Sequence, residues 1–241
     1  MIDWLRRDSR DDPAVEIGDR KLPIVVRRLA RARQLTMRLA PDGSEVRISI
    51  PRWTQTSEAI EFAQSRRDWI ARQLAQVPPP RVVASDCLLP VRGADVRLRH
   101  SPDLPRKPKL LDGTLEIGGP ENSVRDRVRR WLEAEARQLV ASDVARYCEA
   151  AEREIAKSTL TRAKRRWGSC APDGTIRINW RLVMAPDEVR RSVVAHEVAH
   201  LVHFDHSPQF HALLGRLFEG DIDEANDWLK REGRGLYAWF G

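Results

Sequence analysis

Two histidines lie four residues apart in this chain, with a glutamate directly after the first, in the segment His196-Glu197-Val198-Ala199-His200. On an α-helix, side chains four residues apart lie on the same face. Two imidazoles in this arrangement can share one zinc ion, and the glutamate can then hold or deprotonate a water on that ion. The segment therefore predicts a helix that carries a metal site.

The residues around this motif favour a buried helix. Pro186-Asp187-Glu188 has the proline and the acids that are typical of a helix start. Apolar residues then recur at helical spacing: Val189, Val193, Val194, Val198, Leu201 and Val202. Buried histidines and a buried glutamate need partners, because an unpaired buried polar group costs about 1–3 kcal/mol. A bound metal ion would meet that need for all three side chains.

Zinc hydrolases usually supply three protein ligands and keep one position for water. The candidates for the third ligand are His203, His206, His211 and Glu219. His206 lies beyond the expected helix end, where the chain can turn before a second helix expected over 208–219. Glu219 is an alternative, but Gly220 follows it and indicates a helix end. His203 fits a polar residue near the end of the first helix. We favour His206.

A β-hairpin is predicted just before the histidine helix, with strands over 159–166 and 175–182 and a turn at Asp173-Gly174. Between them, Trp167 fits a packing residue better than a substrate platform. The next two residues, Gly168 and Ser169, indicate a close backbone approach or an exposed turn near a cleft. Cys170 could serve as a fourth ligand that silences a metal site, but it fits a small buried hydrophobe better.

Four ordered motifs of this chain resemble the YgjP-like metallopeptidase-domain family, which is related to the zincins of the SprT and WLM type. The motifs are Arg166-Trp167-Gly168-Ser169-Cys170, Ile178-Asn179-Trp180-Arg181-Leu182-Val183, His196-Glu197-Val198-Ala199-His200 and His206-Ser207-Pro208-Gln209-Phe210. The family pattern is R-W-G-S-C, N-W-R-L, H-E-L-x-H and N-H-S-x-x-F-W, at close to these spacings. The resemblance covers most of residues 20–235.

The resemblance implies a site as well as a family. It implies three zinc ligands: His196, His200 and His206. Glu197 would be the catalytic acid/base, and the hairpin would lie beside the metal helix, where a strand edge can pair with an extended substrate. Two positions depart from the family pattern, because Asp205 replaces an Asn and His211 replaces a Trp. We expect Asp205 to orient a ligating imidazole and His211 to line the cleft.

Basic residues surround the hairpin, at Arg162, Lys164, Arg165 and Arg166 and across it at Arg181. They are either a solvated strand face or a site for an anionic group such as a carboxylate, a phosphate or nucleic acid. The residues expected to contact substrate are Arg166, Trp167, Gly168, Ser169 and Arg181. The formal charge of +7 comes from 42 basic and 35 acidic residues, which is a mixed surface. Nucleic acid binding is thus possible but not indicated.

The fold class expected is α+β, with three parts along the chain. Residues 1–19 are expected to be a flexible segment, 20–120 a β-rich part with one helix over 54–76, and 121–241 a helical, zincin-like catalytic core. The prolines at 78–80 mark a linker. A long helix over 122–156 is expected to pack on the metal helix. Further strands are predicted over 23–29, 34–39, 46–50, 88–90, 95–99, 109–111 and 114–117.

The sequence also bears on the compartment in which the protein works. It contains no apolar run long enough to span a bilayer and no signal peptide after the first residue. Its cysteines Cys87, Cys148 and Cys170 show no disulfide framework and no C-x-x-C spacing. We therefore expect a protein of the reducing cytoplasm, without membrane contact. The sequence gives no indication of an oligomeric state.

Taken with the resemblance, these patterns predict a zinc-dependent metallopeptidase that acts on a peptide or protein substrate. One alternative is a metal-dependent nucleotide pyrophosphatase, in which residues 162–166 bind phosphates; three imidazoles argue against magnesium, which prefers oxygen ligands. The other alternative is a non-catalytic module, in which a structural zinc supports binding of nucleic acid or protein. Glu197 argues against that module, since a structural site has no use for a general base.

Overall fold

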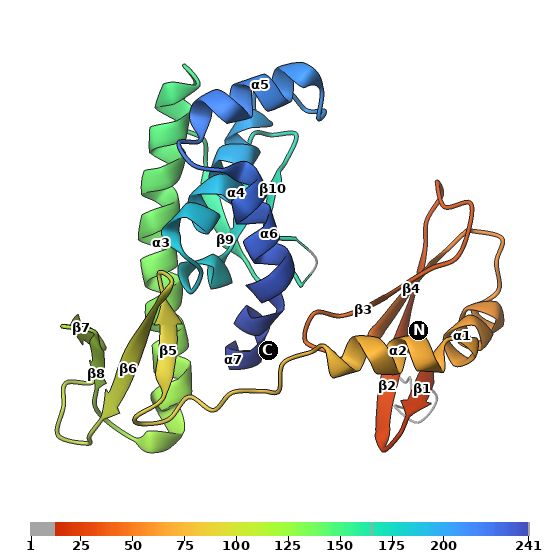
Figure 1. Cartoon of the computed structure of the whole chain (residues 1–241), viewed down its shortest axis with the longest axis horizontal. Coiled ribbons are helices and arrows are strands. Elements are labelled where there is room, and N and C mark those ends of the chain that lie inside the picture. The colour runs from red at the N-terminus through yellow and green to blue at the C-terminus, as the bar shows by residue number, and fades with distance from the viewer. Residues whose placement is uncertain (1–12, 165, 241) are drawn as a thin grey trace, which may run out of the picture. The chain divides into compact units, whose positions relative to one another are not determined.

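The computed structural model of the chain describes residues 13–164 and 166–240. The chain forms two compact units, residues 1–78 and residues 79–241 (Figure 1). The division falls within the prolines at 78–80, which the sequence marks as a linker. Each unit has its own hydrophobic core.

The first unit is built on a mixed four-stranded sheet of order β1-β2-β4-β3. Its strands are β1 (Ala14–Ile17), β2 (Arg20–Arg28), β3 (Thr36–Leu39) and β4 (Val46–Ile50). The three strands predicted over 23–50 are confirmed. Residues 14–17 correct the expectation of a flexible segment over 1–19, because β1 pairs antiparallel with β2 and buries Val15. The rest of that expectation, over residues 1–12, lies outside the described residues.

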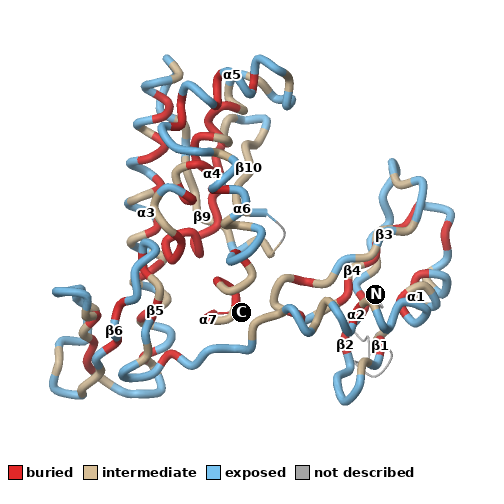
Figure 2. Tube along the Cα trace, viewed as in Figure 1, coloured by how far each residue is buried: buried red, intermediate tan, exposed pale blue. Residues whose placement is uncertain are grey.

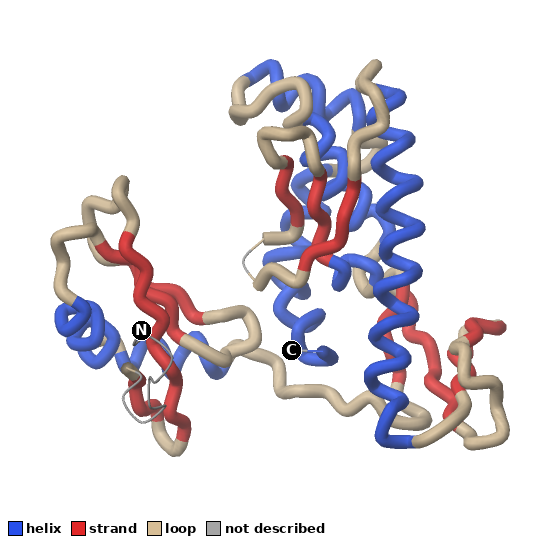
Figure 3. The backbone as a smooth tube through the Cα atoms, turned by 180° about the vertical axis from the view of Figure 1, so that it is seen from behind, coloured by secondary structure: helices blue, strands red, loops and turns tan. Residues whose placement is uncertain are grey.

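Two helices, α1 (Thr56–Ser65) and α2 (Arg67–Ala75), cover one face of this sheet. The sequence predicted one helix over 54–76, but the backbone breaks at Arg66, with φ −111° and ψ 22°. Apolar side chains that alternate along β2 and β4 fill the space beneath the helices: Leu22, Ile24, Val46, Ile48 and Ile50. In Figure 1 the helices lie in front of the sheet, and in Figure 3 the sheet lies in front of the helices.

The second unit begins with another four-stranded sheet, of order β5-β6-β8-β7. Its strands are β5 (Leu88–Val91), β6 (Ala94–His100), β7 (Lys109–Leu111) and β8 (Thr114–Ile117). The strands were predicted, but the boundary expected near residue 120 is wrong. Leu98 and Leu115 of this sheet belong to the same core as Val128 and Leu132 of the following helix. Apolar packing therefore joins these strands to the long helix that follows them, within the second unit.

Helices dominate the rest of the second unit. They are α3 (Val124–Ala150), α4 (Asp187–Ala199), α5 (Pro208–Leu217), α6 (Ile222–Glu232) and α7 (Tyr237–Phe240), with 3₁₀ turns η1 (Glu121–Ser123), η2 (Trp180–Val183) and η3 (Gly233–Leu236). The α4 helix is buried along most of its length (Figure 2) and packs against α3, α5 and α6. None of the described helices has a stretch long and apolar enough to cross a bilayer.

A three-stranded sheet lies beside α4, in the order β10-β11-β9. Its strands are β9 (Ser158–Thr161), β10 (Gly168–Cys170) and β11 (Ile176–Asn179). The sequence correctly predicted a turn at Asp173-Gly174, but the antiparallel partner of β11 is β10, whereas β9 pairs with β11 in parallel. The predicted strand over 159–166 is therefore too long. β10 is the outer strand of this sheet, and no strand of residues 13–164 or 166–240 pairs with its other edge.

A buried ion pair fixes α4 on the long helix α3. Arg190 is 3% exposed, and its Nε donates to Asp143 Oδ2 of α3 at 2.8 Å. Its Nη1 donates to Asp187 at the start of α4, and Asp187 also accepts from Arg92. Because the guanidinium meets carboxylates on two helices, the position of the histidine helix depends on this pair.

Asp143→Asn is expected to lower the free energy of unfolding by about 1–3 kcal/mol, since it removes the charge that accepts from a buried guanidinium. Urea denaturation of the full chain measures the change. The matched control on the same helix is Asp126→Asn, because Asp126 is 60% exposed and pairs with Arg129 at the surface. A surface pair contributes about 0–1 kcal/mol. Equal losses in both variants would contradict the role given to Arg190.

Candidate metal centre

Three histidines converge at the end of α4. His196 lies on the helix, His200 at its C-terminal end and His206 in the loop before α5. Their potential ligand atoms all lie within 4.8 Å of one another, and the Nε2 atoms of His196 and His206 are 3.2 Å apart. We call these three residues the histidine triad. The structure thus brings together the set of ligands that the sequence favoured.

The loop over 200–207 returns His206 to the helix because both of its ends are fixed. At the first end, the N–H of His203 donates to the carbonyl of Ala199. At the other end, Ser207 caps α5 and Pro208 begins it, as predicted. The Asp205 carboxylate accepts from the N–H of Ser207 at 3.4 Å and stabilises the turn, and its orienting of a ligating imidazole stays a prediction.

A backbone contact fixes the tautomer of His200. Its Nδ1 lies 3.0 Å from the carbonyl oxygen of His203. A carbonyl oxygen can only accept, so Nδ1 carries the hydrogen and the Nε2 lone pair is available to a metal ion. His203 contributes its carbonyl, while its imidazole lies outside the triad. This agrees with its interpretation as a polar residue at the helix end.

Phe210 forms the floor beneath the triad, a role that sequence reasoning missed. Its fully buried ring has centroid distances of 5.0 Å to His196, 4.6 Å to His200 and 4.8 Å to His206. An apolar ring in contact with all three imidazoles restricts their rotation. The available signal was its position three residues after the Ser207 cap, which places it in the first turn of α5.

Glu219, the alternative third ligand, is held elsewhere. Its carboxylate accepts from the Tyr147 hydroxyl at 2.8 Å and from Arg146 at 3.2 Å. Arg191 Nε lies 3.1 Å from the same carboxylate. These partners tie Glu219 to α3 and to the outer side of α4, and the structure does not bring it into the triad.

Glu197 lies beside the triad and is 7% exposed. Burial raises the pKa of its carboxyl to about 7, although the backbone N–H of Cys170 and the positive charge of Arg166 lower it. Burial also lowers the pKa of His196 to about 4, with help from the neighbouring imidazoles. A carboxyl with a pKa near neutrality suits a group that both accepts and donates a proton.

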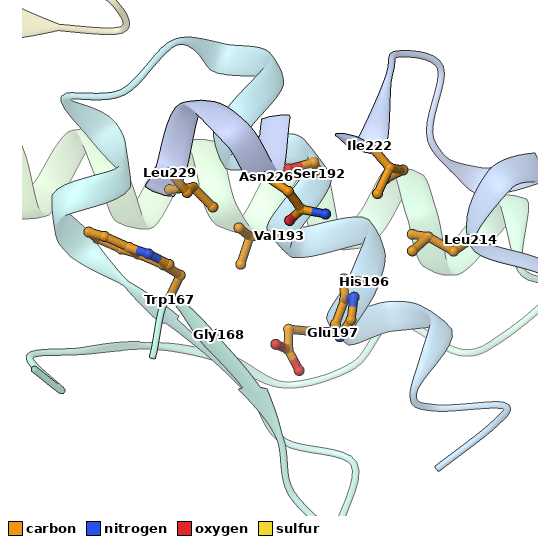
Figure 4. Close-up of a pocket in the computed structure, with 10 residues that line it drawn as sticks. All are labelled: Trp167, Gly168, Ser192, Val193, His196, Glu197, Leu214, Ile222, Asn226 and Leu229. Carbon is orange, nitrogen blue, oxygen red and sulfur yellow. The ribbon is translucent and has the colours of Figure 1, made fainter. Parts of the chain in front are cut away.

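Gly168 of β10 leaves room for the Glu197 carboxylate. A Cβ atom at position 168 would lie 2.5 Å from Glu197 Oε1 and 2.7 Å from Cγ, so the Glu197 side chain would have to move to make room for it. Figure 4 shows this carboxylate next to the β10 backbone. The prediction of a close backbone approach at Gly168 is therefore confirmed, and its partner is Glu197.

A cavity of about 210 Å³ opens next to Glu197 and His196 (Figure 4). Its walls come from β10 and helices α4, α5 and α6. The residues that line it are Trp167, Gly168, Ser192, Val193, His196, Glu197, Leu214, Ile222, Asn226 and Leu229. Apart from His196 and Glu197, no residue of this lining is titratable, so the cavity suits an apolar group. Trp167 both packs, with its ring centroid 5.6 Å from that of Tyr237, and lines the cavity.

Several residues expected at the site lie elsewhere. Arg181 is 5% exposed: its Nη2 donates to the Phe240 carbonyl at 2.6 Å, and its guanidinium lies over the Tyr237 ring. The prediction that Arg181 contacts substrate is therefore wrong, and it instead holds the C-terminal segment. Arg162 pairs with Glu133 on α3. Arg166 is exposed, and its charge acts on the Glu197 carboxyl. The arginine at position 165 lies outside the described residues.

Three further predicted positions lie near the site without joining the triad. Ser169 is half-buried on β10, next to Gly168. Cys170 stands outside the triad as well, which agrees with the rejection of a fourth ligand there. His211 is exposed, with its ring centroid 6.4 Å from that of His206, and it does not line the cavity next to Glu197.

Comparison with known proteins gives one family and one solved structure. A family model described as YgjP-like, metallopeptidase domain, matches residues 33–232. Among solved structures, the chain is similar to the crystal structure of the metallopeptidase zymogen of Pyrococcus abyssi abylysin. That similarity has 19% sequence identity and a TM-score of 0.36, and covers 39% of this chain and 93% of the other. No curated protein matches the chain.

Proposed function

Because this chain belongs to the YgjP-like metallopeptidase-domain family, we propose that it hydrolyses peptide bonds with a zinc ion held by the histidine triad. The observation that carries the proposal is the convergence of His196, His200 and His206 beside the buried carboxylate of Glu197. The family supplies the reaction class, a metal-dependent peptidase. The identity of the metal and the roles of the residues are our inference from geometry.

The donor set fits zinc. Three imidazole nitrogens are typical ligands of zinc, whereas magnesium and calcium prefer oxygen ligands. His196 is held neutral by burial, and the His200 tautomer leaves its Nε2 available. The His196 imidazole can therefore bind a metal ion without first losing a proton. When bound, a zinc ion polarises a substrate carbonyl and makes water acidic enough to react near neutral pH.

Glu197 is the proton carrier in this proposal. Its carboxylate takes a proton from the attacking water and passes it to the nitrogen of the leaving amine. On one side, the N–H of Cys170 donates a hydrogen bond to the carboxylate, and the absence of a side chain at Gly168 leaves room for it. On the other side it meets the cavity, where substrate enters.

Two features select an extended peptide with an apolar side chain. The free edge of β10 offers backbone groups that can pair with a substrate strand. The cavity wall includes Glu197, which in this proposal passes a proton to the leaving amine. That amine is the nitrogen of the residue that follows the cleaved bond. The side chain of the same residue therefore lies close to Glu197, and we infer that the cavity accepts it. A cavity of about 150 Å³ binds benzene, so leucine, methionine and phenylalanine fit here.

The experiment is digestion of an unfolded protein by the full chain with added zinc, followed by mass spectrometry of the products. We expect cleavage before large apolar residues, loss of activity with a chelator and recovery on adding zinc. Nucleoside triphosphate with zinc or magnesium is the parallel substrate for the pyrophosphatase alternative. Triphosphate hydrolysis without peptide cleavage, or cleavage that ignores chelators, would reject the proposal.

The structure favours neither alternative function. No arginine or lysine is among the described residues that line the cavity next to Glu197, and a phosphate site usually gathers several such cations. A structural zinc site is usually closed by four protein ligands. The described residues bring together only the triad, next to a carboxylate with a perturbed pKa. Peptide hydrolysis therefore remains the single function that we propose.

Gly168→Ala is expected to lower peptide hydrolysis by about 10²-fold, because a displacement of a catalytic group by about 1 Å has an effect of that size. The methyl group would push the end of a flexible side chain, so stability should change little. The control is Gly215→Ala on α5, where an added Cβ meets nothing within 4 Å. Catalytic rate and melting temperature are measured for both. A fully active Gly168→Ala enzyme would contradict the placement of Glu197.

A further inference from the structure

The sheet of the first unit has one face that its helices do not cover. Strand alternation and register place Arg27 and Ser49 in one row across this face, with Thr36 next to them on β3. The neighbouring row holds Arg47 of β4 and, directly opposite it on β3, Arg38. Two hydroxyl groups thus lie among three guanidinium groups, a set of donors suited to phosphate oxygens. We call these five residues the arginine face.

The arginine face places like charges on adjacent strands, and a carboxylate pairs with one of them. Like charges directly opposite each other on adjacent strands destabilise a sheet, and Arg38 stands opposite Arg47. Glu45 pairs with Arg47. Among residues 13–164 and 166–240, no carboxylate pairs with Arg27 or Arg38. Two positive charges on the arginine face, those of Arg27 and Arg38, are therefore available to an anionic partner.

The basic character continues at the end of the sheet where β2 and β4 finish. These strands run parallel, so the loop over 29–35 and the turn over 51–55 lie at the same end (Figure 1). Residues 20–41 contain no aspartate or glutamate, and their basic side chains are Arg20, Lys21, Arg27, Arg28, Arg31, Arg33 and Arg38. The turn adds Arg52 and Trp53, and the Trp53 side chain is 75% exposed. An exposed indole next to arginines offers a stacking surface for an unpaired base.

We propose that the arginine face and Trp53 bind single-stranded nucleic acid. The arginines and hydroxyls contact the phosphates, and Trp53 stacks on a base at the end of the sheet. A membrane surface fits less well, because an interfacial site needs a broad apolar face and this sheet exposes mainly polar groups. The proposal concerns the first unit alone and does not depend on peptidase activity.

The test measures the affinity of the full chain for fluorescently labelled single-stranded DNA and RNA 20-mers by anisotropy at several salt concentrations. Arg27→Gln/Arg38→Gln/Arg47→Gln should weaken binding about tenfold or more, and should lower the slope against log salt by about 2, since each phosphate contact on a single strand contributes about 0.7. Trp53→Ala should weaken binding about fivefold or more through lost stacking.

The matched control is Arg66→Gln/Arg67→Gln/Arg72→Gln. This variant also removes three positive charges, but from exposed arginines on α2 and between α1 and α2, the helices that cover the opposite face of the sheet. Its affinity for single strands should fall by less than about threefold. Thermal melting verifies folding, and Arg38→Gln alone, an exposed single change, serves if the triple variant does not fold.

Three results would overturn the proposal: no binding by the wild-type chain, equal losses in the two triple variants, or tighter binding to phosphatidylserine vesicles or duplex DNA than to single strands. Cleavage of a short peptide is measured beside these assays. The cleavage rate should be unchanged in both triple variants. A chain that does not bind nucleic acid would therefore leave the peptidase proposal standing, and a chain that does not cleave peptides would leave the nucleic-acid proposal standing.

Discussion

Glu197→Gln is expected to lower the rate of peptide hydrolysis by about 10²–10⁴-fold, the usual contribution of a general acid–base group. Glutamine has nearly the shape of glutamate, and it cannot accept a proton from water. The buried position should tolerate it, because burial already favours the uncharged form of Glu197. The triad is unchanged in this variant. Zinc content, measured by elemental analysis after dialysis, should therefore equal that of the wild-type enzyme.

The control for this experiment is Glu188→Gln, in the first turn of the same helix. Glu188 is exposed and far along the helix from the triad, so its loss should leave kcat unchanged. A Glu197→Gln enzyme with full zinc content and full activity would remove Glu197 from the mechanism. A variant without zinc would instead show that the carboxylate supports the metal site.

His206→Ala is expected to weaken zinc binding by more than about 10–100-fold, which is the effect of losing a residue that only supports a ligand. His196 and His200 would remain on their helix, but two imidazoles do not complete a zinc site. Activity should fall in parallel with metal content. Titration against a chelator of known affinity measures the dissociation constant in each variant.

His203→Ala is the matched control for His206→Ala, since it removes another imidazole from the same loop. His203 contributes its backbone carbonyl to His200, and alanine keeps that carbonyl. Zinc affinity should therefore change by less than about threefold, within the range of an ordinary surface substitution. Equal loss of zinc in both variants would show that the loop, and not the His206 imidazole, is what the metal requires.

The helix with its two histidines was predictable from the sequence because spacing on a helix is a local property. His206 was predictable because a cap follows it at Ser207 and Pro208. Other parts of the site depend on contacts between distant segments, and no local pattern reveals these. Phe210 is an ordinary apolar residue of an amphipathic helix until folding places it beneath the triad.

The two wrong predictions with the largest consequences concern β10 and Arg181. Gly-Ser-Cys at 168–170 has no alternation and low strand propensity, so the sequence predicts no strand there and places the first strand of the hairpin over 159–166 instead. The Gly-Ser-Cys segment becomes a strand because it pairs with β11. Arg181 looked like a substrate contact because an exposed arginine is the usual case. The C-terminal segment covers it, and that contact lies about sixty positions along the chain.

The contact between Trp167 and Tyr237 joins the wall of the cavity next to Glu197 to the C-terminal segment of the chain. The Arg181 guanidinium lies over the Tyr237 ring and donates a hydrogen bond to the Phe240 carbonyl. Under the proposed function, we expect the selectivity for a substrate side chain to depend on these residues of the C-terminal segment, although they do not line the cavity. We therefore expect a substitution at position 237 to change which peptides are cleaved, while the histidine triad and Glu197 stay in place.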